Sequence, residues 1–258
     1  MNKTTQGTLF AVSLGPGDPD LITRKAWAQL QTSAIWAYPI RRKGSPSYAL
    51  DIAINSGLSV PEGSVALIFP MTHDRDRLQT AWDTAAEQVL GLLNQGNDVS
   101  FLVEGDASTY STFGHLARTI LEQSPGTEIN RIAGVTSFNA AAARLALPLA
   151  DVDDKLAVLP AGYGIETLAT ALDQFDSLVL LKVKPLLDPI LDLLEQRGLL
   201  EHSRFIEKAG APQERVVSDL KQLRGEKVNY LSLIIVKNPY REKPPLIRGC
   251  KSKSENNK

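Results

Sequence analysis

The chain has 258 residues, of which 43% are hydrophobic and 22% are charged, with 18 glycines and 15 prolines. This composition is typical of a globular protein and excludes the collagen-like, coiled-coil and disordered classes. The 28 basic and 29 acidic residues leave a formal net charge of −1, so we expect no overall field that recruits nucleic acid or an anionic membrane.

The first half of the chain alternates between predicted strands and predicted helices. Residues 8–14 form a short apolar run that ends at Gly15-Pro16-Gly17-Asp18, and residues 21–30 have helical spacing. The same alternation continues with strands at 33–38, 64–69 and 98–103 and helices at 48–55, 77–94 and 112–123. Alternation of this kind predicts an α/β fold around a mostly parallel sheet.

The segment Ser124-Pro125-Gly126-Thr127 is the clearest linker. We place the domain boundary there, which predicts an N-terminal α/β domain over 1–125 and a C-terminal α/β domain over 126–240. The second domain is expected to contain strands at 128–133, 156–159, 177–183, 203–207 and 229–236 and helices at 138–147, 166–173 and 186–197. Residues 241–258 are polar, basic and aperiodic, which is typical of a disordered tail.

The glycine-rich loop after the first predicted strand has two interpretations. Its backbone N–H groups, at the start of a helix, are suited to a ligand, but the loop can equally be a tight turn capped by Asp18 or Asp20. A dinucleotide fingerprint requires glycine where Asp20 stands and an acidic residue near Tyr38. NAD and FAD are therefore disfavoured, and the sequence has no P-loop motif.

Two further loops follow predicted strands, at the edge where open α/β sheets bind ligands. Gly105 permits close approach of a ligand, and Asp106 can accept hydrogen bonds or cap the next helix. Thr136 or Ser137 is expected to cap the alanine-rich helix that follows. Capping and ligand binding are compatible at these positions.

The remaining polar residues point to no metal chemistry. Arg41, Arg42 and Lys43 either clamp an anionic ligand or form a solvated charged run. The three histidines are far apart and lack zinc-ligand spacing, so we expect no metal site. The single cysteine, Cys250, excludes an intrachain disulfide framework and favours a reducing compartment, by default the cytoplasm. We expect no signal peptide, because residues 1–7 contain no apolar h-region, and no membrane span, because no run approaches about 18 apolar residues.

Taken together in order and spacing, these loops resemble those of the tetrapyrrole (class III) methyltransferases. The segment from Gly7 to Ala26 is similar to that family's first strand and helix almost residue for residue, and the resemblance covers roughly residues 7–237. Further segments fall where family loops are expected, namely 104–106, 134–137, 208–214 and 231–236. Residues 38–39, 69–72 and 110–112 look most like the branch that methylates C20 of precorrin-2 or of cobalt-factor II.

The resemblance implies two α/β domains with mixed sheets, an active-site cleft between them and a homodimer. It also implies S-adenosylmethionine as methyl donor and S-adenosylhomocysteine as product. By position, the donor is expected to contact Pro16, Gly105, Thr109 and Tyr110 in the first domain and Thr136, Ser137, Leu181, Lys182, Ala209, Ser232 and Leu233 in the second.

The implied reaction is C-methylation of precorrin-2 at C20 to give precorrin-3A in cobalamin biosynthesis. Asp106 is the best candidate for a catalytic polar role, although its sequence context fits a structural role nearly as well, and Arg41, Arg42 and Lys43 are candidate clamps for the substrate carboxylates. The alternatives are cobalt-factor II as acceptor, another tetrapyrrole carbon, or a protein or RNA acceptor. A non-catalytic module that binds a nucleotide-like ligand also stays open.

Overall fold

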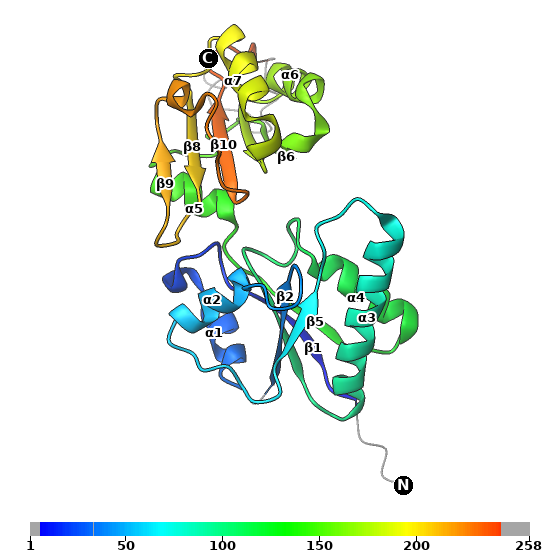
Figure 1. Cartoon of the computed structure of the whole chain (residues 1–258). Helices are drawn as coiled ribbons and strands as arrows, with labels where there is room; N and C mark the ends of the chain where they lie inside the picture. Colours follow the sequence, from blue (N-terminus) through cyan, green and yellow to red (C-terminus); the bar gives the residue numbers. More distant parts are fainter. Residues whose placement is uncertain (1–5, 33, 244–258) are drawn as a thin grey trace, which may run out of the picture.

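The computed structural model describes residues 6–32 and 34–243. Within them, the chain forms two sheets of five strands, in the orders β3-β2-β4-β1-β5 and β6-β7-β10-β8-β9. Figure 1 shows each sheet with its helices as a separate lobe, joined where the chain passes from β5 towards α5. The predicted α/β class with two domains is confirmed.

The first sheet is parallel throughout. Its strands are β1 (Leu9–Ser13), β2 (Ile35–Ile40), β3 (Val65–Ile68), β4 (Val99–Val103) and β5 (Ile129–Ile132). Its helices are η1 (Pro19–Leu21), α1 (Arg24–Leu30), α2 (Tyr48–Asn55), α3 (Arg75–Asn94) and α4 (Phe113–Gln123). Every residue of β4 is buried, as expected for a central strand covered by helices on both faces.

The helices cover the first sheet in two layers. Leu9 and Ala11 of β1 pack against α3 and α4 in one apolar cluster, whereas Val12 packs against α1 and α2 in another. Successive strand residues point to opposite faces, so one strand supplies both clusters. The connections after β1 and β4 therefore leave towards opposite faces, which defines a crevice between the ends of these two neighbouring strands.

The chain passes from the first sheet to the second after β5, which is later than the domain boundary predicted at residue 125. β5 pairs with β1, with Leu9 opposite Ile129, so the segment 124–127 is the loop between α4 and β5 rather than a domain linker. The helix α5 (Ser137–Arg144) belongs to the second sheet, since Ala141 and Ala142 pack with Val179 of that sheet. A proline-glycine turn indicates that a helix or strand has ended, but it does not show to which sheet the next strand belongs.

The second sheet is mixed. Its strands are β6 (Leu156–Pro160), β7 (Ser177–Leu181), β8 (Ser203–Glu207), β9 (Arg215–Val217) and β10 (Ser232–Lys237). Only β6 and β7 pair in parallel, while β7-β10, β10-β8 and β8-β9 are antiparallel. Its other helical elements are η2 (Ala161–Tyr163), α6 (Ile165–Gln174), η3 (Lys184–Leu186), α7 (Leu187–Gln196) and η4 (Leu220–Leu223). The sequence analysis missed β9, which has three residues.

The beginning of the predicted disordered tail is bound to the second domain. Arg241 Nη2 lies 2.8 Å from Asp176 Oδ2, and the two side chains are only 8% and 3% exposed. Lys243 Nζ lies 2.6 Å from Asp154 Oδ1. The prediction is therefore corrected for 241–243, while 244–258 lie outside the described residues. No helix in the described part of the chain is long and apolar enough to cross a membrane.

Candidate active site

The carboxyl ends of β1 and β4 are joined through glycine backbone. Gly15 N–H donates to Gly105 O at 3.2 Å, and Gly105 N–H donates to Gly15 O at 2.7 Å. Gly105 has φ +71°, and a Cβ at this position would meet no atom within 4 Å. The backbone of Gly105 therefore borders open space, as required where a ligand approaches the chain closely.

The Asp106 side chain connects the loop after β4 to the loop after β5 by hydrogen bonds. Its Oδ1 accepts a hydrogen bond from Ser108 N–H at 2.9 Å, and its Oδ2 accepts one from Gly134 N–H at 2.8 Å. A Cβ at Gly134 would lie 2.4 Å from Ser13 Cβ and 2.7 Å from Gly105 O, so the three loop segments are tightly packed. These contacts favour the structural alternative for Asp106, and its catalytic role stays a prediction.

Two of the helix caps expected from the sequence are present, whereas Asp106 does not cap α4, whose N-cap residue is Thr112. Asp18 Oδ1 accepts from Asp20 N–H at 3.0 Å, and Thr136 Oγ1 accepts from Asn139 N–H at 3.3 Å at the start of α5. Each cap satisfies a backbone donor that a helix leaves unpaired.

Several predicted donor contacts come together at one end of the second sheet. Leu181 on β7 is paired with Leu233 on β10, and Lys182 N–H donates to Ser232 O at 3.1 Å. Leu181, Leu233 and Ala209 belong to one buried cluster with α5. Segments that are widely separated in sequence thus form one apolar cluster at this end of the sheet.

This end of the second sheet meets the strand-end loops of the first, and we call the meeting surface the domain junction. Tyr110 Oη, from the loop after β4, donates to Val158 O on β6 at 3.1 Å. A Cβ at Gly17 would lie 3.1 Å from Ala211 N, and one at Gly210 would lie 2.9 Å from Asp18 N. Close backbone contacts therefore fix the loops of the two domains against one another.

Backbone strain is concentrated at the domain junction. Tyr110, Lys182 and Lys208 have φ values of +50°, +57° and +51°, in the left-handed region. Such conformations cost about 1–3 kcal/mol for residues other than glycine and are retained where the surrounding structure imposes them, commonly at functional sites. Two of the three residues are predicted donor contacts.

The three basic residues after β2 are not equivalent. The guanidinium carbon of Arg41 lies 5.8 Å from the ring centroid of Tyr230 in the second domain. Arg42 and Lys43 are exposed, and the backbone N–H groups of Arg41 and Arg42 both donate to Ser45 Oγ, at 3.1 and 3.2 Å. The structure thus directs only Arg41 to the domain junction.

The sequence analysis assigned no role to Glu104, a charged residue near this junction. Its position directly after the predicted strand could have indicated one, but only the nearby Asp106 was considered as a candidate. Removal of hydration by the surrounding protein raises the pKa of Glu104, and the positive charges of Arg41 and Lys182 partly oppose that shift. Burial and the charges of Glu104 and Asp51 raise the pKa of Tyr48 to about 12, and its hydroxyl donates to Pro16 O at 3.0 Å.

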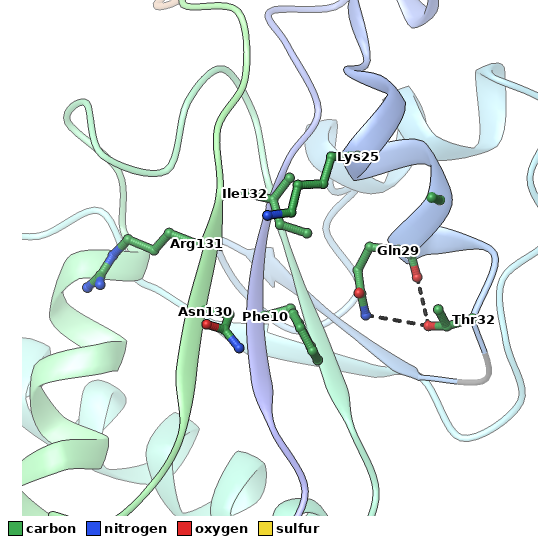
Figure 2. Close-up of a pocket in the computed structure, with 8 residues that line it drawn as sticks. Phe10, Lys25, Gln29, Thr32, Asn130, Arg131 and Ile132 are labelled. Atoms are coloured by element: carbon green, nitrogen blue, oxygen red, sulfur yellow. Dashed lines mark hydrogen bonds between the residues drawn. The ribbon is translucent and has the colours of Figure 1, made fainter.

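A separate hollow of about 420 Å³ lies on the flank of the first domain. Figure 2 shows it between α1, β1 and the edge strand β5, with the side chains of Lys25, Gln29 and Asn130 around it, whereas the Arg131 side chain points to the other side of β5. Phe10 and Thr32 place it towards the amino end of β1, away from the strand ends that carry the predicted site. None of the predicted site residues lines it, so we assign the candidate site to the domain junction.

Comparison with known proteins identifies the class. The family described as Tetrapyrrole (Corrin/Porphyrin) Methylases matches residues 8–224. This match covers most of the chain, and the chain belongs to that family. The resemblance drawn from its loops is confirmed.

Three relatives match nearly end to end. The chain is 36% identical to the cobalt-precorrin-2 C(20)-methyltransferase of Salmonella typhimurium, covering 89% of this chain and 96% of the relative. It is 31% identical to the probable cobalt-precorrin-2 C(20)-methyltransferase of Methanocaldococcus jannaschii, covering 92% and 98%. It is 29% identical to the precorrin-2 C(20)-methyltransferase of a Sinorhizobium species, again covering 92% and 97%.

A solved structure shares the fold. The uroporphyrin-III C-methyl transferase from Thermus thermophilus, solved in complex with S-adenyl homocysteine, superposes with a TM-score of 0.61 at 22% identity, covering 90% of this chain and 97% of that one. The two-domain architecture is therefore that of a known methyltransferase fold.

Proposed function

We propose that this protein transfers a methyl group from S-adenosylmethionine to C20 of precorrin-2, giving precorrin-3A and S-adenosylhomocysteine. The end-to-end match to relatives named as C(20)-methyltransferases carries this proposal. The convergence of strand-end loops from both sheets at the domain junction supports it, because ligands of α/β proteins bind at such ends.

The donor fits the second-domain side of the domain junction. Leu181, Leu233 and Ala209 offer apolar contacts, and the backbone around Lys182 and Ser232 offers polar ones. Gly105 brings the first domain's backbone to the same place without a side chain. Main-chain groups with apolar walls suit an adenine and an aminocarboxylate.

The acceptor fits the first-domain side. A tetrapyrrole that carries several carboxylates is attracted by basic side chains, and arginine binds a carboxylate through two parallel hydrogen bonds. Arg41 lies at the domain junction, and Arg42 and Lys43 stand beside it on the same exposed turn. In this arrangement the protein contributes alignment of the acceptor carbon, methyl and sulfur, and exclusion of water.

A cobalt-containing acceptor is the second candidate. The relatives named for cobalt-precorrin-2 are 36% and 31% identical, compared with 29% for the one named for precorrin-2. The test is anaerobic incubation with methyl-labelled S-adenosylmethionine and, in separate tubes, metal-free precorrin-2 and its cobalt form. We expect one added methyl at C20 in at least one tube, and the tube that reacts identifies the acceptor.

The result that contradicts the proposal is absence of transfer in both tubes. Tight binding of S-adenosylhomocysteine without any transfer would instead support the non-catalytic binding module. The homodimer and the cytoplasmic location form part of the same proposal. Light scattering of the purified chain tests the dimer, and fractionation of the source cells tests the location.

A further inference from the structure

Glu104 lies directly after β4, in the strand-end loop that leads to the domain junction, and its carboxylate has no direct partner among the described residues. It follows the last residue of β4, the strand between β1 and β2. Protein atoms surround its carboxyl group and reduce its hydration, but the residue is still accessible to solvent. Among the described residues, no cation lies within ion-pair distance of its carboxylate and no donor is hydrogen-bonded to it. This differs from Asp106, two residues later, whose two carboxylate oxygens are both bound to backbone N–H groups.

Two cations act on Glu104 from opposite domains. Arg41 follows β2 and Lys182 follows β7, and the charges of both act on the Glu104 carboxyl. Arg41 lies over the ring of Tyr230 in the second domain at 5.8 Å, and Lys182 Nζ lies 5.9 Å from the ring centroid of Tyr110 in the first. Each cation is thus directed towards an aromatic ring of the other domain.

The remaining titratable neighbour is not suited to accept a proton. Tyr48 lies near enough for its charge to couple with Glu104, but burial raises its pKa to about 12, so it is neutral at pH 7. Its hydroxyl also donates to Pro16 O. Glu104 is therefore a carboxylate at the domain junction that is free to take up a proton, beside the open space that the backbone of Gly105 borders, and a carboxylate placed near a reacting carbon can act as a general base.

We propose that Glu104 is the proton acceptor of the methyl-transfer reaction, with the charges of Arg41 and Lys182 acting on its carboxylate from the two domains. This inference rests on the proposed function. In the first step the acceptor carbon attacks the methyl, so that a carbon–carbon bond forms, the carbon–sulfur bond breaks and its electron pair stays on sulfur. The acceptor carbon then carries both methyl and hydrogen, and the macrocycle carries one positive charge.

In the second step the Glu104 carboxylate takes the proton from that carbon. The electron pair of the broken carbon–hydrogen bond returns to the ring system and neutralises its charge. Because Glu104 is accessible to solvent, the proton then passes to water. No oxidant or reductant is needed, and the products are the methylated macrocycle, S-adenosylhomocysteine and one proton.

The test compares wild type with Glu104→Gln under anaerobic single-turnover conditions. Glutamine retains the size of the side chain but cannot accept the proton. We expect appearance of the final chromophore to slow by about 10²- to 10⁴-fold, the usual contribution of a positioned base. The affinity for S-adenosylhomocysteine, measured by calorimetry, should change by less than about threefold, equivalent to about 0.6 kcal/mol.

The pH profile separates a chemical role from a structural one. In wild type the rate should rise with pH as Glu104 loses its proton, over a range above that of an ordinary glutamate. This rise of the rate with pH should be absent in Glu104→Gln. Glu104→Asp should show the same rise, but with lower rates throughout. The matched control is Glu122→Gln on the exposed face of α4, which should behave as wild type.

Failure of the inference differs from failure of the proposed function. If wild type and Glu104→Gln form the chromophore at equal rates with the same pH profile, the inference is wrong while the methyl transfer stands. If wild type transfers no methyl to either tetrapyrrole, the proposed function is wrong and the role of Glu104 falls with it.

Discussion

The two domains use their charged residues differently. Within the described residues, every side-chain ion pair lies between Arg144 and Lys243, in α5 or the second domain. The first domain is stabilised by a sheet covered on both faces by apolar helices and by close glycine contacts at its strand ends. Its charges at the domain junction are thus left available for a ligand, whereas many charges of the second domain stabilise the fold.

The largest effect is expected from the buried pair that ties residue 241 to the second domain. Replacing Arg241 with alanine leaves the Asp176 carboxylate, 3% exposed, without its bidentate partner. Breaking this pair should destabilise the protein clearly, even though the Lys155 N–H at 2.8 Å and Lys243 Nζ at 3.7 Å still face the Asp176 carboxylate. Urea unfolding at pH 7 measures the loss.

The control for this substitution is Arg224→Ala in the same domain. Arg224 pairs with Asp192 and Glu195, but all three side chains are more than a third exposed. Solvent screens such exposed pairs, so we expect a much smaller loss of stability than in Arg241→Ala. Equal losses of stability in the two variants would contradict the distinction between buried and exposed pairs.

The corresponding weak point of the first domain is a glycine rather than an ion pair. In Gly134→Ala the new Cβ would lie 2.4 Å from Ser13 Cβ and 2.7 Å from Gly105 O. Overpacking of this kind costs about 1–3 kcal/mol, and we expect a value near the upper end because the loop also holds Asp106. In Gly126→Ala, which has no neighbour within 4 Å, the free energy of unfolding should change by less than about 0.5 kcal/mol.

The charges of the first domain should affect substrate binding rather than stability. Changing Arg41, Arg42 and Lys43 together to alanine should raise the KM for the tetrapyrrole about tenfold, or about 1.4 kcal/mol. Arg41→Ala alone should account for most of this change, because Arg41 lies at the domain junction. Steady-state kinetics measures KM, and donor affinity should stay unchanged.

Lys25→Ala is the matched control for those charge removals. It deletes a cation that lines the flank hollow instead of the domain junction, so KM should not change. An unchanged KM in the triple variant would show that residues 41–43 do not bind the substrate.

Acid should weaken the second domain before the first. Hydrogen bonds from Lys243 and Lys237 lower the pKa of Asp154. Burial alone would raise the pKa of Asp176, but hydrogen bonds from Arg241 and the Lys155 N–H lower it overall. A carboxyl with a lowered pKa contributes stability above its unfolded value of about 3.9 and loses that contribution as pH falls through its folded value.

We therefore expect Asp154→Asn to remove stability on the order of 1 kcal/mol at pH 7 and to flatten the acid dependence of unfolding. Thermal melts from about pH 7 down to about pH 2 measure both effects, because the loss begins only near the unfolded pKa of about 3.9. As a control, Asp83→Asn, on the exposed part of α3, should leave the curve unchanged. If Asp154→Asn left the pH dependence as steep as in wild type, this explanation would be incorrect.

The first domain was more predictable from sequence than the second, for a physical reason. In a parallel sheet all carboxyl ends lie at one edge, so the loops at Gly15 and Gly105, which the sequence placed after strands, lie side by side. In the mixed sheet, the end of β7 lies beside the start of β10, and local sequence does not show that pairing. The contacts at Leu181 and Leu233 were therefore accessible only through the family resemblance.

Pairing also explains what the sequence analysis placed incorrectly or missed. The partner of β5 lies more than 100 residues earlier in the chain, so no local signal could assign this strand to the first sheet. Glu104 was overlooked because its significance depends on Arg41 and Lys182, which reach it from other strands. Helix limits set by capping residues, such as Thr136 before α5, were predicted well because the cap is local.

The most direct test of the central claim is amide hydrogen exchange with and without S-adenosylhomocysteine. We predict protection in both domains at once, around Gly105 and Tyr110 in the first and around Lys182, Ala209 and Ser232 in the second. The flank hollow, followed through Thr32 and Asn130, should not change. Protection confined to one domain, or centred on the flank hollow, would contradict a methyl-donor site shared between the two sheets.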